Sequence, residues 1–123
     1  MKSQALSISA IEWGTIDIVG IGKFRDAKLF PGGAKEWDWK QTNTHHVPGI
    51  QPIDVEELLK NGSEFIVLSR GMQLVLQTCP ETVELLNKLS IPFAIEETTQ
   101  AVAIYNRLLF QGMRVGALIH STC

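Results

Sequence analysis

Short runs of apolar positions, separated by glycines, dominate the first thirty residues. Residues 8–13 are rich in apolar and β-branched side chains and end at Gly14, and residues 16–19 alternate between apolar and polar positions. A period of two is typical of a strand with one buried face. Residues 24–30 follow two further glycines and have the same character. The pattern predicts three short strands in an antiparallel meander.

From residue 54 onward the chain alternates between helical and strand patterns. Asp54 precedes an apolar stripe of helical spacing, which predicts a helix that Asp54 caps and that ends at Asn61 and Gly62. Residues 65–68 form a continuous apolar run. Such a run is expected of a central strand that is buried on both faces.

Further helices and strands follow this apolar run. Pro80 stands in the first turn of a predicted helix, whose buried stripe is expected at Val83, Leu86 and Leu89. A strand, a helix and a strand are then expected at residues 91–95, 98–111 and 115–119. Strands that alternate with helices favour right-handed crossovers and a largely parallel sheet. The predicted class is therefore α/β, with an antiparallel β extension at the front.

Residues 31–53 show no regular period, because prolines and glycines interrupt them, yet they contain Trp37 and Trp39. Segments of this length in compact domains are usually functional or flexible. Two tryptophans argue against mere flexibility, since each large ring needs a surface to cover. We expect the segment to be ordered, with at least one of the two rings mostly buried.

Composition narrows the classes of function. The chain has 123 residues, 11 Lys and Arg against 13 Asp and Glu, and a net charge of −2. That length suits one domain over residues 1–123, and the charge is unsuited to a nucleic-acid-binding surface. No stretch is long and apolar enough to span a membrane. We expect no secretory signal or arginine-rich presequence at the start, and two cysteines suit a reduced, cytoplasmic compartment.

The segment Arg70-Gly71-Met72 directly follows the predicted buried strand. In open α/β sheets, ligands gather beyond the carboxyl ends of such strands. Arg70 offers a planar set of donors for a carboxylate or phosphate, and Gly71 permits close approach of another backbone. These residues are a candidate binding site. Alternatively, Arg70 pairs with an acidic neighbour and Gly71 makes an ordinary turn.

The sequence Trp37-Asp38-Trp39 places two large rings around a carboxylate. In an extended segment both rings point the same way and Asp38 points the opposite way. The rings could form part of an exposed partner site, since tryptophan is enriched at interface hot spots. They could equally anchor the long segment to the sheet.

Histidine and cysteine residues form no recognised metal signature, because no CxxC or HxxxH pair occurs. His120 and Cys123 are three positions apart, but Cys123 is the last residue of the chain and is expected to be weakly ordered. We therefore expect no metal or cofactor. The residues considered are His45, His46, His120, Cys79 and Cys123.

Catalytic motifs are equally weak. Ser69 lacks the G-x-S-x-G elbow, and Cys79 in a helix-capping sequence is more often a small packed residue. Gly20 and Gly22 lack the third glycine of a dinucleotide-binding motif, and no phosphate-binding loop occurs. The residues therefore indicate a protein that is not an enzyme.

A set of short motifs nevertheless occurs in a distinctive order. They are Trp13-Gly14, Pro31-Gly32-Gly33, Trp37-Asp38-Trp39, His46-x-Pro48-Gly49-x-x-Pro52, Arg70-Gly71-Met72, Gln100-Ala101-Val102-x-x-Tyr105-Asn106, Gln111-Gly112-x-Arg114-Val115-Gly116 and His120-Ser121-Thr122-Cys123. With these motifs the chain resembles, over nearly its whole length, the family of adipogenesis-associated proteins with an Mth938 domain.

The resemblance implies a three-layer α/β domain with a mixed central sheet and flanking helices. It also implies a cytoplasmic protein connected with preadipocyte differentiation and adipogenesis, without catalytic residues to carry over. A related branch of that family assists the assembly of respiratory complex I in mitochondria, and the expected lack of a presequence argues against that role here. By motif match, a surface site would include Arg70, Gly71 and Met72.

The sequence therefore leaves two classes of function open. The first is a non-catalytic regulatory or scaffold protein that acts through contacts with an unidentified protein partner. The second is a binder of small molecules or anions, or an enzyme, with a pocket at Arg70-Gly71-Met72. A deep, partly apolar pocket at these residues would favour the second class, and a shallow site would favour the first.

Overall fold

The structure is a computed structural model that describes residues 6–123. The start of the N-terminal segment in which we expected no targeting signal, residues 1–5, lies outside the described residues. The central sheet of the described part has the strand order β5-β4-β8-β6-β7. Its strands are β4 (Asp26–Phe30), β5 (Gly33–Glu36), β6 (Phe65–Ser69), β7 (Phe93–Glu96) and β8 (Val115–His120).

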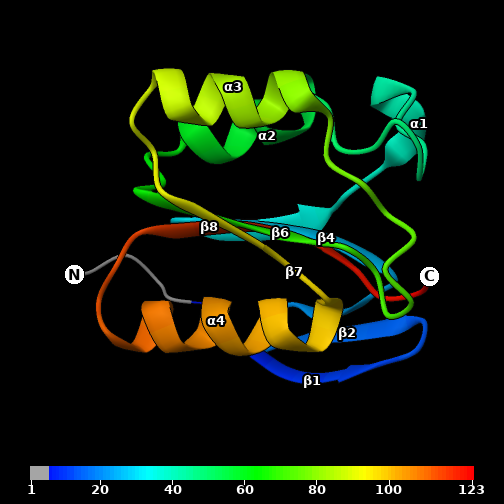
Figure 1. Ribbon diagram of the computed structural model, residues 1–123. Coiled ribbons are helices and arrows are strands. Elements are labelled where there is room, and N and C mark those ends of the chain that lie inside the picture. Colours follow the sequence, from blue (N-terminus) through cyan, green and yellow to red (C-terminus); the bar gives the residue numbers. More distant parts are fainter. Residues whose placement is uncertain (1–5) are drawn as a thin grey trace.

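Helices and a second sheet cover the two faces of the central sheet (Figure 1). Helices α2 (Pro52–Lys60) and α3 (Pro80–Lys88) lie on one face. Helix α4 (Thr98–Phe110) lies on the other, beside a small antiparallel sheet formed by β1 (Ile8–Glu12), β2 (Thr15–Ile18) and β3 (Gly22–Phe24). The predicted α/β class, with three layers, a mixed central sheet and an N-terminal β extension, is confirmed.

Strand β6 explains why the run at residues 65–68 is continuously apolar. It lies inside the sheet, between β8 and β7, and is parallel to both. Ile66 and Leu68 pack into the core beneath α2 and α3, whereas Val67 packs into the core beside α4. All three are fully buried. Each such side chain contributes about 1.5–3 kcal/mol through its burial, and the prediction of an internal buried strand is confirmed.

The N-terminal strands differ from the predicted meander in one respect. The chain bends at Arg25, so that residues 24–30 are two strands, β3 and β4, in two different sheets. The Arg25 carbonyl accepts hydrogen bonds from the N–H and the hydroxyl of Ser121, which lies just beyond β8. A contact that spans almost the whole chain therefore fixes a bend that the local pattern does not contain.

The cap of α2 and the buried face of α3 differ slightly from the prediction. Helix α2 begins at Pro52, and Asp54 occupies its third position, where its carboxylate accepts from the N–H of Gln51. The prediction that Asp54 itself is the cap is therefore wrong. In α3 the buried residues are Thr82 and Leu86, and Leu89 is exposed, because the helix ends one residue before it.

The long segment 31–53 is ordered and contains two elements that its sequence did not reveal, β5 and the short helix α1 (Trp39–Thr42). Only 2% of Trp37 is exposed, which confirms that one ring anchors the segment. Asp54, fully buried, accepts hydrogen bonds from Trp37 Nε1 at 3.2 Å and from the Thr44 hydroxyl at 2.7 Å. The Thr42 hydroxyl and the Gln51 N–H complete its four donors.

Candidate functional site

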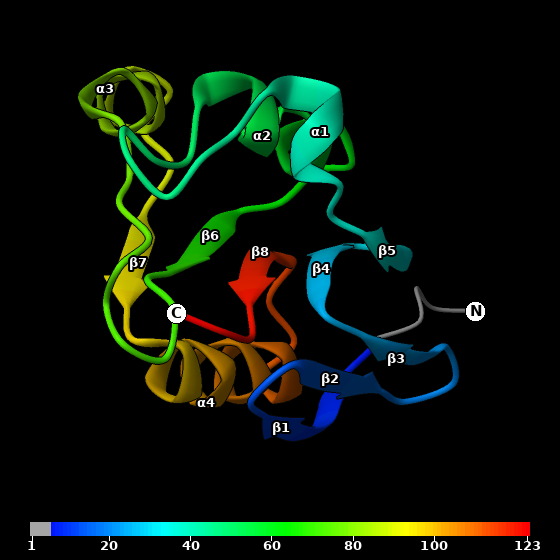
Figure 2. The same ribbon diagram turned by 90° about the vertical axis from the view of Figure 1, so that its right-hand side faces the viewer.

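The carboxyl ends of β6, β7 and β8 meet at one edge of the central sheet, because these strands run parallel. Strand β4 runs antiparallel to β8, so its first residue, Asp26, lies at the same edge and pairs with His120. Figure 2 faces this edge, where the loop after β6 and the end of the chain also lie. We call this region the carboxyl edge. It is the place where ligands gather in open α/β sheets.

His120 is the best-connected side chain of the carboxyl edge. It is 3% exposed, and its Nδ1 lies 2.7 Å from Asp26 Oδ1. Because a carboxylate only accepts, Nδ1 of His120 carries the proton of this hydrogen bond. Nε2 lies 3.2 Å from His46 Nε2 and 3.2 Å from the Thr122 hydroxyl. The tautomers of the two rings decide which atom donates in each of these contacts.

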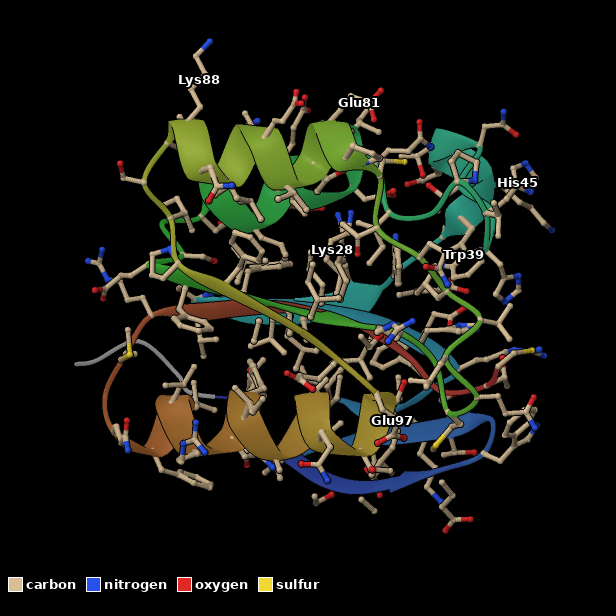
Figure 3. All side chains as sticks on the ribbon, viewed as in Figure 1. Lys28, Trp39, His45, Glu81, Lys88 and Glu97 are labelled. Carbon is tan, nitrogen blue, oxygen red and sulfur yellow. The ribbon has the colours of Figure 1, made fainter. Side chains whose placement is uncertain are left out.

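Trp39 packs against both histidine rings. Its ring centroid is 4.7 Å from that of His120 and 4.9 Å from that of His46, while the two histidine rings are 5.1 Å apart. Figure 3 shows Trp39 at the carboxyl edge and His45 farther out, at the rim of the molecule. Trp39 Nε1 is buried and has no hydrogen-bond partner among residues 6–123. The rings of Trp39, His46 and His120 are thus in mutual contact at this edge.

The position of His46 depends on a neighbouring loop. Its carbonyl accepts a hydrogen bond of 2.9 Å from the N–H of Gln77, which follows β6 in the sequence. Burial lowers the pKa of the His46 imidazole, and the nearby His120 lowers it further, whereas Asp26 has a smaller opposite effect. A neutral ring is therefore favoured, and a neutral ring keeps one nitrogen lone pair available to a ligand.

Cys123 is held in place by the loop after β6. Its carbonyl accepts from the N–H groups of Gln73 and Val75 at 3.2 and 3.0 Å, and the carbonyl before it accepts from Met72 at 2.6 Å. Gly71 has φ of +86°, and a Cβ at this position would overlap the Cys123 backbone. The expectation that Cys123 is weakly ordered is therefore wrong. The space beside Gly71 is therefore occupied by the backbone of Cys123.

A shallow depression of about 290 Å³ opens over the histidine cluster. Enclosed sites for small molecules measure roughly 300–1,000 Å³ and cover most of the ligand. Trp37, Asp38 and Trp39 line the depression, but Arg70, Gly71 and Met72 do not. The other residues that line it are Arg25, Asp26, Glu36, Lys40, His46, His120, Thr122 and Cys123.

The two candidate motifs thus contact different residues near the end of the chain. Met72 contacts Thr122 through a backbone hydrogen bond, and Trp39 packs on His120. Asp38 caps α1, because its carboxylate accepts from the Lys40 N–H at 2.9 Å. Of the tryptophans, Trp37 is an anchor and Trp39 is half-buried at the site.

Arg70 is half-buried, and its backbone bridges two neighbours, donating to the Glu96 carbonyl and accepting from the Leu76 N–H. Within residues 6–123, its guanidinium takes part in no salt bridge; those formed there are Lys28–Glu57, Lys35–Glu57 and His120–Asp26. Among residues 6–123, no acidic side chain forms a salt bridge with Arg70. The described structure therefore gives no support to the alternative in which Arg70 pairs with an acidic neighbour.

Three of the five histidines and cysteines come together at the carboxyl edge, although their spacing in the sequence predicts no metal site. One ligand atom from each of His46, His120 and Cys123 lies within 4.8 Å of the other two. Cys79 and His45 are not members of this group. The sequence carries one signal that could have drawn attention to it, namely that His120 ends a strand at the edge where ligand sites form.

Comparison with known proteins places the chain in a family. The model of a family described as a protein of unknown function (DUF498/DUF598) matches residues 8–120. The chain belongs to this DUF498 family. The match spans every helix and strand of the described structure, from β1 to β8.

Solved structures of similar proteins support the same fold. One called MT938 is 23% identical, with a TM-score of 0.76, and the match covers 96% of this chain and 99% of the other. A Bartonella henselae structure described as an outer membrane protein is 22% identical, with a TM-score of 0.78 and 96% of each chain covered. A Mth938-like domain from Bordetella pertussis is 18% identical, with a TM-score of 0.56 and coverage of 95% and 86%.

These comparisons establish a Mth938-like domain of unknown function. At such identities the structural similarity concerns the fold alone. Within residues 6–123, no helix has the length and apolar character needed to cross a bilayer.

Proposed function

We propose that this DUF498-family chain is a non-catalytic protein that binds a protein partner through the carboxyl edge. The observation that carries the proposal is a set of exposed apolar side chains on segments that contact the end of the chain. Trp13, Val47, Leu74 and Val75 are 55%, 69%, 44% and 40% exposed. Exposed apolar side chains gathered in one place are typical of an interaction surface.

Backbone hydrogen bonds join the segments that carry Trp13, Leu74 and Val75 to the end of the chain. Gly14, which follows Trp13, donates to the Ser121 carbonyl, and Val75 donates to the Cys123 carbonyl. Val47 follows His46, whose ring lies beside that of His120. The four exposed side chains therefore belong to segments that contact residues 120–123.

Charge suggests the chemistry of the partner. Arg70 precedes the loop that carries Leu74 and Val75, and its guanidinium has no salt bridge among the described residues. A planar guanidinium binds a carboxylate with two parallel hydrogen bonds. The surface thus suits a partner segment with apolar side chains around an aspartate or glutamate, or around a terminal carboxylate.

The shallow depression supports a protein partner over a small molecule, because a broad open surface buries little of a small ligand. The alternative pocket at Arg70-Gly71-Met72 lacks support, since neither that depression nor a second one beside α2 is lined by these residues. The sequence resemblance supports a cytoplasmic role in adipogenesis. The role in complex I assembly rests on resemblance to a related branch alone, and we do not advance it.

The experiment is affinity capture from preadipocyte cytosol with the purified chain and two variants of the surface, Arg70→Ala and Trp13→Ala. Phe110→Ala is the matched control, because Phe110 is 74% exposed but lies at the far end of α4. We expect one partner whose capture falls at least about tenfold in both surface variants and is unchanged in the control.

Melting temperatures separate binding from folding. If Arg70→Ala lowers the melting temperature while capture per folded molecule stays the same, Arg70 is structural and the proposal fails. Equal loss in the Phe110→Ala variant would also contradict it, because the captured protein would then recognise no particular face.

A further inference from the structure

The carboxyl edge also holds a cluster whose chemistry the partner surface does not use. We propose that His46, His120 and Cys123 form a zinc site with three protein ligands and one open coordination position. The inference does not depend on the proposed partner. It rests on the distances within the cluster, on the hydrogen bond behind His120 and on the anchoring of Cys123.

The spacing of the two histidines already matches zinc coordination. Their Nε2 atoms are 3.2 Å apart. Two nitrogens that each lie about 2.0–2.1 Å from one tetrahedral zinc ion are separated by about 3.3–3.4 Å. Zinc therefore takes the place of the proton between the two Nε2 atoms, with little change in their separation. That proton leaves for solvent, and the ring that carried it takes up a proton at Nδ1, so both rings coordinate as neutral imidazoles.

The hydrogen bond behind His120 provides the expected support. Metal-binding histidines usually donate their other N–H to a carboxylate or carbonyl, which fixes the ring and makes the coordinating nitrogen more basic. Asp26 Oδ1 accepts from His120 Nδ1 at 2.7 Å in this way. The strand pairing of Asp26 with His120 holds the two residues at this separation. Asp26 is thus a positioning residue of the site.

Cys123 supplies the third ligand. Its candidate sulfur atom lies within 4.8 Å of the histidine ligand atoms, and tetrahedral coordination requires an N···S separation of about 3.5 Å. Its carbonyl is held by Gln73 and Val75, so the proposal assigns the remaining difference to a rotation of the Cys123 side chain. Binding releases the thiol proton to solvent, because the thiolate is the form that ligates zinc.

The ligand set favours zinc among common cations. Two imidazoles and a thiolate are ligands for zinc and copper rather than for magnesium or calcium, which prefer oxygen. Three protein ligands leave a fourth position for water or an added ligand, unlike closed structural sites with four. The depression over the cluster gives solvent access to that position. Trp39, which also lines the depression, packs against both histidine rings.

Equilibrium dialysis of the reduced, untagged, full-length chain against zinc, at neutral pH with a competing chelator, tests the proposal. We expect one zinc per chain with a dissociation constant below about 1 μM. His46→Gln and Cys123→Ser should each weaken binding by at least about 100-fold. Asp26→Asn should weaken it by about 10–100-fold, as expected for a group behind a ligand. Matched controls are His45→Gln and Cys79→Ser, which should bind zinc like the wild type.

Cobalt replaces zinc as a spectroscopic probe. The wild-type complex should show a thiolate-to-cobalt charge-transfer band and intense visible bands of tetrahedral cobalt, and Cys123→Ser should lose the charge-transfer band. Circular dichroism of each metal-free variant verifies its fold, and His46→Gln is preferred to a change at the buried His120. Less than one zinc per chain at 10 μM free metal would overturn the proposal. Equal affinity in His46→Gln, or preference for copper with no zinc bound, would also overturn it.

Discussion

Residues 37–54 and the helix–strand half from β6 to β8 both bury key side chains completely, but they use different chemistry. In the second half, Ile66, Val67 and Leu68 are fully buried among apolar neighbours. In the first, the fully buried Asp54 carboxylate collects four donors, among them Trp37 Nε1. The helix–strand half is stabilised mainly by apolar packing. Residues 37–54 are stabilised mainly by the hydrogen bonds of one buried carboxylate, one of which comes from Trp37.

The difference has a consequence for tolerance to mutation. Apolar contacts are non-directional, so conservative changes in a core usually cost little. A buried carboxylate and its donors depend on each other, because a donor left without a partner incurs its full desolvation cost. The long segment should therefore be more sensitive to changes that preserve shape than the sheet is.

The largest effect is expected from Trp37→Ala, at about 3–5 kcal/mol of lost unfolding free energy, the usual range for a buried aromatic. Trp39→Ala should cost only about 1–2 kcal/mol, because its ring is half-buried and its Nε1 is unpaired among the described residues. Urea denaturation measures both. Unchanged stability in both variants would show that the segment is not anchored by these rings.

Asp54→Asn preserves shape but offers one acceptor oxygen to four donors, and we expect a loss of about 2–3 kcal/mol. The matched change in the sheet is Ile66→Val, which should cost about 0.5–1.5 kcal/mol. Chemical denaturation of the two variants compares the regions directly. An Asn variant that loses no more stability than the Val variant would remove the distinction between them.

Thr44→Val sharpens the same comparison with a smaller change. The Thr44 hydroxyl donates to Asp54 Oδ2 at 2.7 Å, and valine has nearly the same size without a donor. We expect a loss of about 1–2 kcal/mol, typical of one hydrogen bond to a charged group. The double variant Asp54→Asn with Thr44→Val should lose less unfolding free energy than the sum of the two single variants, because both changes remove the same hydrogen bond. Additive losses would show that Thr44 and Asp54 act independently.

The smallest effect concerns Glu57, whose carboxylate joins α2 to the sheet. Figure 3 shows Lys28 between sheet and helix, and Lys28 and Lys35 lie 3.3 and 2.8 Å from the Glu57 oxygens. Lys35 holds the pKa of Glu57 below its ordinary value, and Lys28 adds to this. The unfolded chain thus binds this proton more readily than the folded one.

The contribution of Glu57 is therefore fully present above its ordinary pKa of 4.5 and is lost as the pH falls through the folded value. Thermal melts of Glu57→Gln and of the wild type should converge as the pH decreases from 7 into that range. A constant difference between the two proteins at all pH values would show that the salt bridges to Lys28 and Lys35 contribute nothing.

Periodic apolar positions allowed the helix–strand half to be predicted well. The strand at 65–68 and the helix over 98–111 appear as β6 and α4 with bounds changed by a residue. Prediction failed where the deciding contact is distant in sequence. The bend at Arg25 depends on Ser121, and α1 and β5 form within a segment whose order depends on Asp54.

The candidate site shows the same limit. Arg70-Gly71-Met72 and Trp37-Asp38-Trp39 were found from their residue types, and the structure places them against different residues near the end of the chain, with Met72 bonded to Thr122 and Trp39 packed on His120. The histidine cluster was set aside because the sequence shows no metal-binding spacing. His46 and His120 are 74 positions apart, so no local motif could have joined them.

The sequence by itself determined the alternation of helices and strands after residue 54, the internal strand β6 and the α/β class, because burial follows from the period of apolar side chains along one element. Only the tertiary structure decided which polar groups meet. Parallel pairing of β6 with β8 and antiparallel pairing of β4 with β8 bring Asp26 and His120 to one edge, and the Gln77 bond brings His46 to them. Their meeting depends on strand order and loop contacts, which side-chain periodicity does not specify.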